Sequence, residues 1–132
     1  MASNIGLSDL TKDESNTIGF VVACLFSSAI DLNELKQWAT SIVERLDVED
    51  IPDYIFELME FDGPLAGVYK TIGFTPAWNR SDEEDVALYG IAVKRGKDVF
   101  DMPVSSASAL QSLDDNPHIK DAFNLVFPFV AI

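Results

Sequence analysis

Three segments of this chain combine the spacing of a helix capping box with a run of apolar residues shortly after it. In a capping box, the side chains of the first and fourth residues each accept a hydrogen bond from the backbone N–H of the other, so two donors at the start of a helix are satisfied. The pairs are Thr11 with Glu14, Asp31 with Glu34, and Ser81 with Glu84. Three such starts in 132 residues predict a fold built from helices.

The first box predicts a helix from about Lys12 to Ala29 with one apolar face turned inward. The inward positions are Ile18, Val21, Val22, Leu25, Phe26 and Ala29. A buried strand over residues 17–26 is the alternative, because β-branched residues are frequent there and because Gly19 costs a helix about 1 kcal/mol. The pattern is compatible with both, and we favour the helix since no partner strand is evident nearby.

The other two boxes predict longer, regular helices. An apolar stripe follows Asp31 and continues to about Leu46. The helix that begins after Ser81 has acidic residues in its first turn and basic residues around Gly96, as the helix dipole favours.

Proline and glycine mark shorter elements. Pro64 predicts a short helix over residues 65–72, and Gly73 closes it. Residues 74–80 are predicted to be an extended loop, because Pro76 disfavours helix at the residue before it. Ser105 or Ser106 is expected to cap a short helix over residues 107–113.

The last helix is predicted to start at Asn116 and Pro117 and to end at Pro128. The apolar tail, residues 129–132, is expected to pack back on the core, with an extended conformation as one possibility. In sum, the chain is predicted to be one all-α domain, residues 1–132, of six or seven short helices, with residues 1–10 flexible.

The segment from Asp47 to Asp62, here called the acidic segment, combines a buried and a charged face in one predicted helix. Its apolar stripe is Ile51, Tyr54, Ile55, Leu58 and Met59. Its carboxylates are Asp47, Glu49, Asp50, Asp53, Glu57, Glu60 and Asp62. No basic residue lies between Arg45 and Lys70, so the repulsion between neighbouring carboxylates has no local compensation.

The whole chain is strongly acidic, with a net charge of −13. Such a charge repels nucleic acid and anionic lipid and attracts basic partners. The plainer interpretation is that the acidic surface only keeps the protein in solution. Neither a signal peptide nor a membrane span is evident in the sequence, so a cytoplasmic location is expected.

Few residues suggest chemistry. His118 is the only histidine, so we expect neither a Ser-His-Asp triad nor a His-rich metal site within one chain. Cys24 is the only cysteine and is interpreted as a buried hydrophobe. Phosphate-binding glycine loops are also absent from the sequence. The acidic runs at residues 47–50 and 81–85 lack the spacing of an EF-hand loop. We therefore predict no catalytic residue, metal or cofactor, and hence a protein that is not an enzyme.

A protein-binding surface is the remaining prediction. Phe56 lies among the carboxylates of the acidic segment, and Trp78 precedes a second acidic cluster. Exposed aromatic residues surrounded by acids are typical of a surface that binds a partner rich in Lys and Arg. The predicted contact residues are those carboxylates with Phe56, Trp78, Asp82, Glu83 and Asp85. The alternative is that both aromatic rings belong to the core.

The overall profile resembles the small immunity proteins that protect bacteria from contact-dependent growth inhibition toxins and related polymorphic toxins. The resemblance is carried by a short acidic helical chain with GFTPAWNRSDEEDVALYGIAVKRG at residues 73–96 and FPFVAI at the C-terminus. It implies a tight one-to-one complex with a toxin domain, often a basic nuclease, whose active site is blocked or distorted. Two other functions stay open: a helical adaptor that docks a protein through an apolar groove, and a hydrolase that uses carboxylates with or without a metal.

Overall fold

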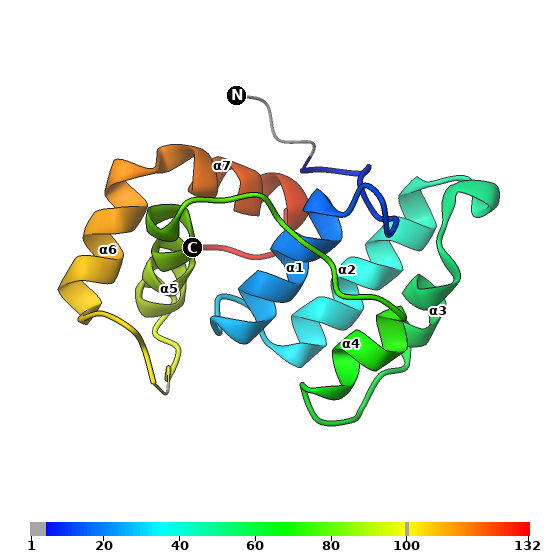
Figure 1. The fold of residues 1–132 in the computed structure, drawn as a ribbon, viewed down its shortest axis with the longest axis horizontal. Helices are drawn as coiled ribbons and strands as arrows, with labels where there is room; N and C mark the ends of the chain where they lie inside the picture. Colours follow the sequence, from blue (N-terminus) through cyan, green and yellow to red (C-terminus); the bar gives the residue numbers. More distant parts are fainter. Residues whose placement is uncertain (1–4, 100) are drawn as a thin grey trace.

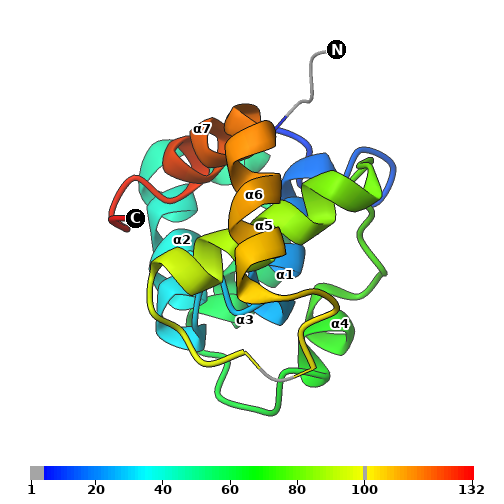
Figure 2. The same ribbon diagram turned by 90° about the vertical axis from the view of Figure 1, so that its left-hand side faces the viewer.

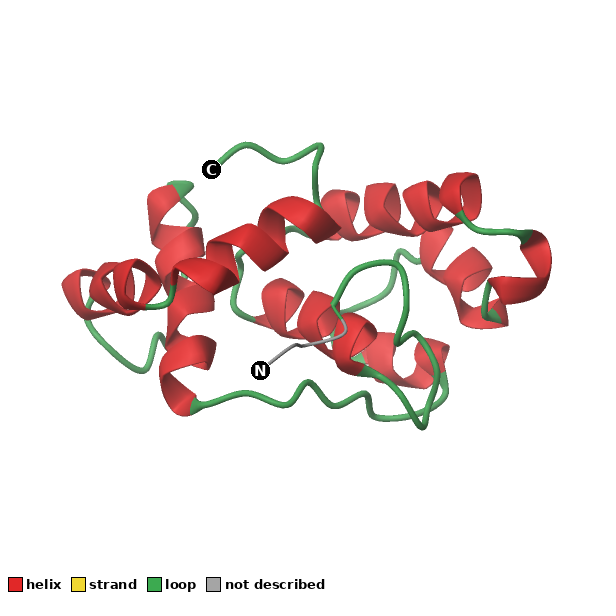
Figure 3. Cartoon of the chain, turned by 90° about the horizontal axis from the view of Figure 1, so that it is seen from above, coloured by secondary structure: helices red, strands yellow, loops and turns green. Residues whose placement is uncertain are grey.

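The structure, a computed structural model, describes residues 5–99 and 101–132, and within these residues it contains helices and loops but no strand (Figure 3). The elements are α1 (Asn16–Phe26), α2 (Leu32–Arg45), the 3₁₀ turn η1 (Val48–Asp50), α3 (Asp53–Met59), α4 (Gly67–Ile72), α5 (Asp82–Lys94), α6 (Ser106–Asp115) and α7 (Pro117–Val126). The predicted all-α class is confirmed, and residues 16–26 form a helix and not a strand.

Helix α1 lies in the middle of the molecule. Helices α5, α6 and α7 gather at one end of the long axis, and α2, α3 and α4 lie toward the other end (Figures 1 and 2). One apolar core runs through both groups, with Phe20 of α1, Trp38 of α2, Leu88 of α5 and Phe123 of α7 fully buried. Eight of the eleven residues of α1 are buried, so the helix is enclosed on more than one face.

Two of the three predicted capping boxes are present. In α2, the Glu34 backbone N–H donates to Asp31 Oδ1 and the Asp31 N–H donates to Glu34 Oε1, both at 2.9 Å. The same reciprocal pair joins Ser81 and Glu84 at the start of α5. Each box satisfies two donors that the first turn leaves without partners.

The predicted box at Thr11 is wrong, because α1 begins at Asn16. The backbone carbonyl of Asp9 instead accepts hydrogen bonds from the N–H groups of Thr17 and Ile18, so a folded-back N-terminal segment caps the helix. Residues 5–10 therefore do not fit the expected flexible terminus, since Leu10 is buried and Asp9 is bonded to α1. Residues 1–4 lie outside the described residues.

The helix within the acidic segment is also shorter than predicted. It divides into η1 and the seven-residue helix α3, with Pro52 preceding α3 and Glu60 following it. Its predicted apolar stripe is nevertheless correct, because Ile51, Tyr54, Ile55 and Leu58 are buried and Met59 packs against the core.

The ends of the other helices differ from the prediction by a few residues. Helix α4 ends at Gly73, whose left-handed φ of 89° suits glycine. Ser105 caps α6 by accepting from the Ser108 N–H. The Asn116 side chain does not cap α7, since its amide donates to the Ser112 carbonyl of α6. The tail, residues 129–132, packs back in part: Val130 is buried and Ile132 packs against the core, whereas Phe129 is 40% exposed.

The loop of residues 74–80 is extended, as predicted, and crosses α1 at close range (Figure 1). The Ser15 hydroxyl bonds to both the N–H and the carbonyl of Ala77, at 2.9 and 3.2 Å. A Cβ atom at Gly19 would lie only 2.6 Å from the Trp78 backbone nitrogen. Gly19 is therefore required for the crossing, which explains a glycine inside a helix.

Candidate protein-binding surfaces

The side chains of the acidic segment are open to solvent. All of its carboxylates, Asp47, Glu49, Asp50, Asp53, Glu57, Glu60 and Asp62, belong to exposed residues. None of them takes part in an ion pair within residues 5–99 and 101–132, where the ion pairs involve other acids. Over the described residues, these carboxylates therefore lack basic partners in the folded structure as well as in the neighbouring sequence.

Two large apolar side chains are exposed within this acidic segment. Phe56 is 41% exposed, as predicted, and Val48 is 77% exposed, which the helical pattern did not indicate. Val48 lies in η1 and Phe56 in α3, so both accompany the carboxylates of these elements. Apolar groups surrounded by uncompensated charge are typical of a protein-binding surface with an anchor and a charged rim.

The predicted exposure of Trp78 is wrong. Its side chain is 4% exposed and packs edge to face on Phe20, with 5.0 Å between ring centroids. The Arg80 guanidinium covers its ring at 5.3 Å from the centroid. The crossing of the 74–80 loop over α1 presses Trp78 into the core, so its contribution is to the fold.

The second acidic cluster, residues 82–85, has partners of its own. Asp85 pairs with Arg80 at 3.0 Å, while Glu84 completes the capping box and contacts His118 Nε2 at 2.6 Å. The backbone hydrogen bond from Ser81 and the contact with His118 hold the pKa of Glu84 below its usual value. Asp82 and Glu83 are exposed. The cluster starts α5, at the opposite end of the molecule from α3, so it does not extend the acidic segment (Figure 1).

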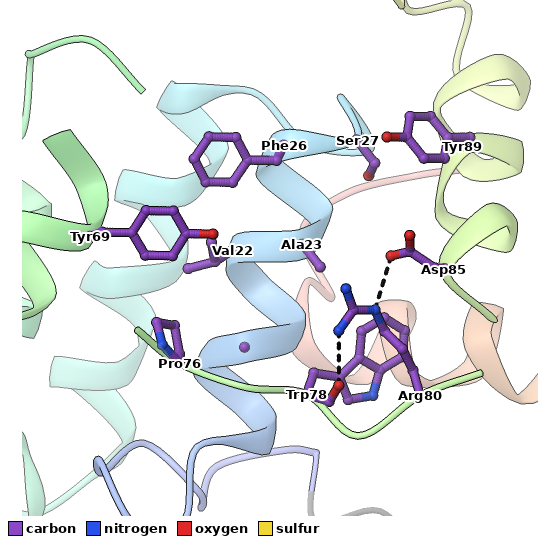
Figure 4. Close-up of a pocket in the computed structure, with 11 residues that line it drawn as sticks. Val22, Ala23, Phe26, Ser27, Tyr69, Pro76, Trp78, Arg80, Asp85 and Tyr89 are labelled. Atoms are coloured by element: carbon purple, nitrogen blue, oxygen red, sulfur yellow. Dashed lines mark hydrogen bonds and ion pairs between the residues drawn. The ribbon is translucent and has the colours of Figure 1, made fainter. Parts of the chain in front are cut away.

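A groove that the sequence did not predict lies over α1, between α4 and α5 (Figure 4). It has a cavity volume of about 220 Å³, and Val22 and Ala23 form its base. Phe26 stacks on Tyr69 with ring centroids 5.5 Å apart, and Tyr89 faces them from α5. The Arg80–Asp85 pair closes one end. This α1 groove contains two tyrosines and an arginine, residue types that are frequent at the centres of protein interfaces.

The only cysteine and the only histidine of the chain lie on different helices, α1 and α7. Cys24 is buried, and this burial raises the pKa of its thiol well above the usual value. His118 is exposed near the start of α7, as its position suggested. Within the described residues, no three His, Cys, Asp or Glu side chains gather closely enough to hold a metal ion.

Over residues 5–99 and 101–132, every helix is too short or too polar to cross a bilayer. No family model, no curated protein and no solved structure matches this chain.

Proposed function

We propose that this chain is an immunity protein that binds a basic toxin domain through the acidic segment and thereby neutralises the toxin. The observation that carries the proposal is the combination found there: exposed carboxylates without ion-pair partners in the described chain, with Val48 and Phe56 exposed among them. The resemblance to toxin immunity proteins supplies the class of partner.

The physical mechanism is substitution of carboxylates for nucleic-acid phosphates. A nuclease active site attracts polyanions, and a row of exposed carboxylates presents a similar negative potential to that cleft. Phe56 then provides apolar contact area that excludes water from the surrounding charge pairs. The charges increase the rate of association, and the apolar contact slows dissociation.

Co-expression tests this proposal. The chain is produced together with the product of the reading frame that lies beside its gene, and the complex is isolated through a tag on the chain. We expect a one-to-one complex with nanomolar or tighter affinity, and an association rate that falls as salt concentration rises. Association that is insensitive to salt, or a partner without a basic surface, would contradict the proposal.

A second candidate is a helical adaptor that docks another protein through an apolar groove, and the α1 groove favours it. The stacked rings of Phe26 and Tyr69 are both partly exposed there. Such docking buries few charges, so its affinity would change little with salt. Loss of binding in Tyr69→Ala, with Glu57→Lys having no effect, would select this candidate over the immunity protein.

A further inference from the structure

A second groove, here called the N-terminal groove, lies beside the acidic segment and has a cavity volume of about 340 Å³. One side is the N-terminal segment, residues 7–11, and the other side is made by Leu46, Asp50 and Pro52. Its lining includes leucine and proline residues, and its acidic lining residues are Asp9 and Asp50.

The N-terminal side of this groove is held in place by three hydrogen bonds. The Asp9 carbonyl accepts from the backbone N–H groups of Thr17 and Ile18, at 3.2 and 3.3 Å. The hydroxyl of Tyr54, in α3, donates to the Leu10 carbonyl. Burial raises the pKa of that hydroxyl, so it keeps its proton. A groove with fixed sides binds a ligand without the entropic cost of first ordering the segment.

Asp9 is the unusual residue among those that line the groove. Asp9 is only 8% exposed, and its single side-chain hydrogen bond in the described chain is from the Asn16 amide to Oδ2, at 3.2 Å. It forms no ion pair within residues 5–99 and 101–132. The basic residues nearest in sequence to the two sides, Lys12 and Arg45, are exposed and likewise unpaired there. A largely buried carboxylate without a cation is costly unless a bound group compensates it.

A ligand that matches this groove would have a positive charge at the end of an apolar chain. We propose that the N-terminal groove receives an arginine side chain from a basic protein partner. The methylene groups of the arginine lie against Leu46 and Pro52, and its guanidinium bonds to the carboxylates of Asp9 and Asp50. Arginine fits better than lysine because its guanidinium is planar, weakly hydrated and able to donate to two carboxylates at once. The inference rests on the proposed function in one respect, namely that a basic partner supplies the arginine.

An NMR titration of the whole protein tests the groove without any partner. The probes are N-acetyl-arginine amide, its neutral analogue N-acetyl-citrulline amide, and the apolar N-acetyl-norleucine amide. We expect saturable shifts of backbone amides in residues 7–11 and 46–52 with the arginine probe, and affinity weaker by about tenfold or more for citrulline, because hydrogen bonds to charged groups are the stronger ones. Equal binding of citrulline or norleucine would overturn the proposal, and so would shifts spread evenly over the acidic segment.

Asp9→Asn is the decisive variant. Asp9 has a φ of 59°, a left-handed conformation that asparagine also tolerates, and an asparagine oxygen can still accept from the Asn16 amide. Asp13→Asn is the matched control, because Asp13 is an exposed acid of the same loop and does not line the groove. We expect D9N to lose the preference for arginine over citrulline and D13N to retain it. Equal behaviour of the two variants would overturn the proposal.

The outcome is separable from that of the proposed function. If a basic toxin domain binds in co-expression but the probes show no arginine preference, the N-terminal groove is not an arginine site and the immunity function stands. If the arginine preference is found and no basic partner is captured, the groove is assigned correctly and the proposed partner is wrong.

Discussion

Replacement of Gly19 by alanine tests the crossing of the 74–80 loop over α1. In a helix that contacts nothing at this position, Gly→Ala stabilises the fold by about 1 kcal/mol. Here the new Cβ would lie 2.6 Å from the Trp78 backbone nitrogen and 2.7 Å from the Ala77 carbonyl carbon. Both neighbours are backbone atoms, so rotation of a side chain cannot relieve the clash. We therefore expect the opposite sign, a loss of stability.

The magnitude follows from the displacement that the methyl group requires. Ordinary contact begins near 3.4 Å, so the loop must move by about 0.8 Å from its 2.6 Å approach. Overpacking of this kind costs about 1–3 kcal/mol. The two hydrogen bonds between Ser15 and Ala77, worth about 1 kcal/mol each, would be weakened at the same time. After the gain in helix propensity is subtracted, the free energy of unfolding should fall by roughly 1–3 kcal/mol.

Urea unfolding monitored by tryptophan fluorescence measures this change, because Trp38 and Trp78 are both buried. Thermal unfolding should show a Tm lower by roughly 3–9 °C. Gly67→Ala in α4 is the matched control, since a Cβ there meets only the Phe61 ring, at an ordinary 3.5 Å. Stability equal to or above that of the wild type in G19A would refute the crossing and the role of Gly19 in it.

Three further predictions concern buried or partly buried groups. Tyr54→Phe should lower the free energy of unfolding by about 1–3 kcal/mol in urea titrations, because the Leu10 carbonyl loses its donor; an unchanged midpoint would show that water replaces the hydroxyl. Partial burial alone would raise the pKa of Glu34, but the hydrogen bonds from Arg95 outweigh it and the pKa lies below the usual value. The stabilisation by Glu34 is therefore present above its unfolded pKa and lost as pH falls through the lower folded pKa. Glu34→Gln should then lower the free energy of unfolding more at neutral pH than at roughly pH 3. An equal loss at both pH values would contradict the ion pair. Cys24 should react with a thiol reagent only as the protein unfolds, and rapid labelling of the native protein would contradict its burial.

Local signals in the sequence were sufficient for most of the fold. The boxes at Asp31 and Ser81 depend on residues within one helical turn, and both are present. The buried apolar stripe of the acidic segment follows from the helical period alone, and its prediction was also correct. No capping box forms at Thr11, because the backbone carbonyl of Asp9 accepts the hydrogen bonds from the N–H groups in the first turn of α1.

Contacts between distant segments account for what the sequence did not reveal. Trp78 was predicted to be exposed because it lies in a proline-containing loop near an acidic cluster, yet it is buried because this loop crosses α1. Gly19 was the one available signal, since a glycine inside an apolar helix indicates close approach of another segment. The N-terminal groove combines Asp9 with Asp50, and no local pattern connects residues so far apart in sequence.

The proposed toxin complex depends on the acidic segment more than on any other surface. Its most direct test is the affinity of Glu57→Lys/Glu60→Lys for the captured partner, beside Asp114→Lys/Asp121→Lys, which makes the same change in net charge at exposed acids of α6 and α7. We expect binding weaker by at least about tenfold in the first variant and nearly unchanged in the second. Equal affinities of the two variants would contradict the proposal that the acidic segment faces the partner.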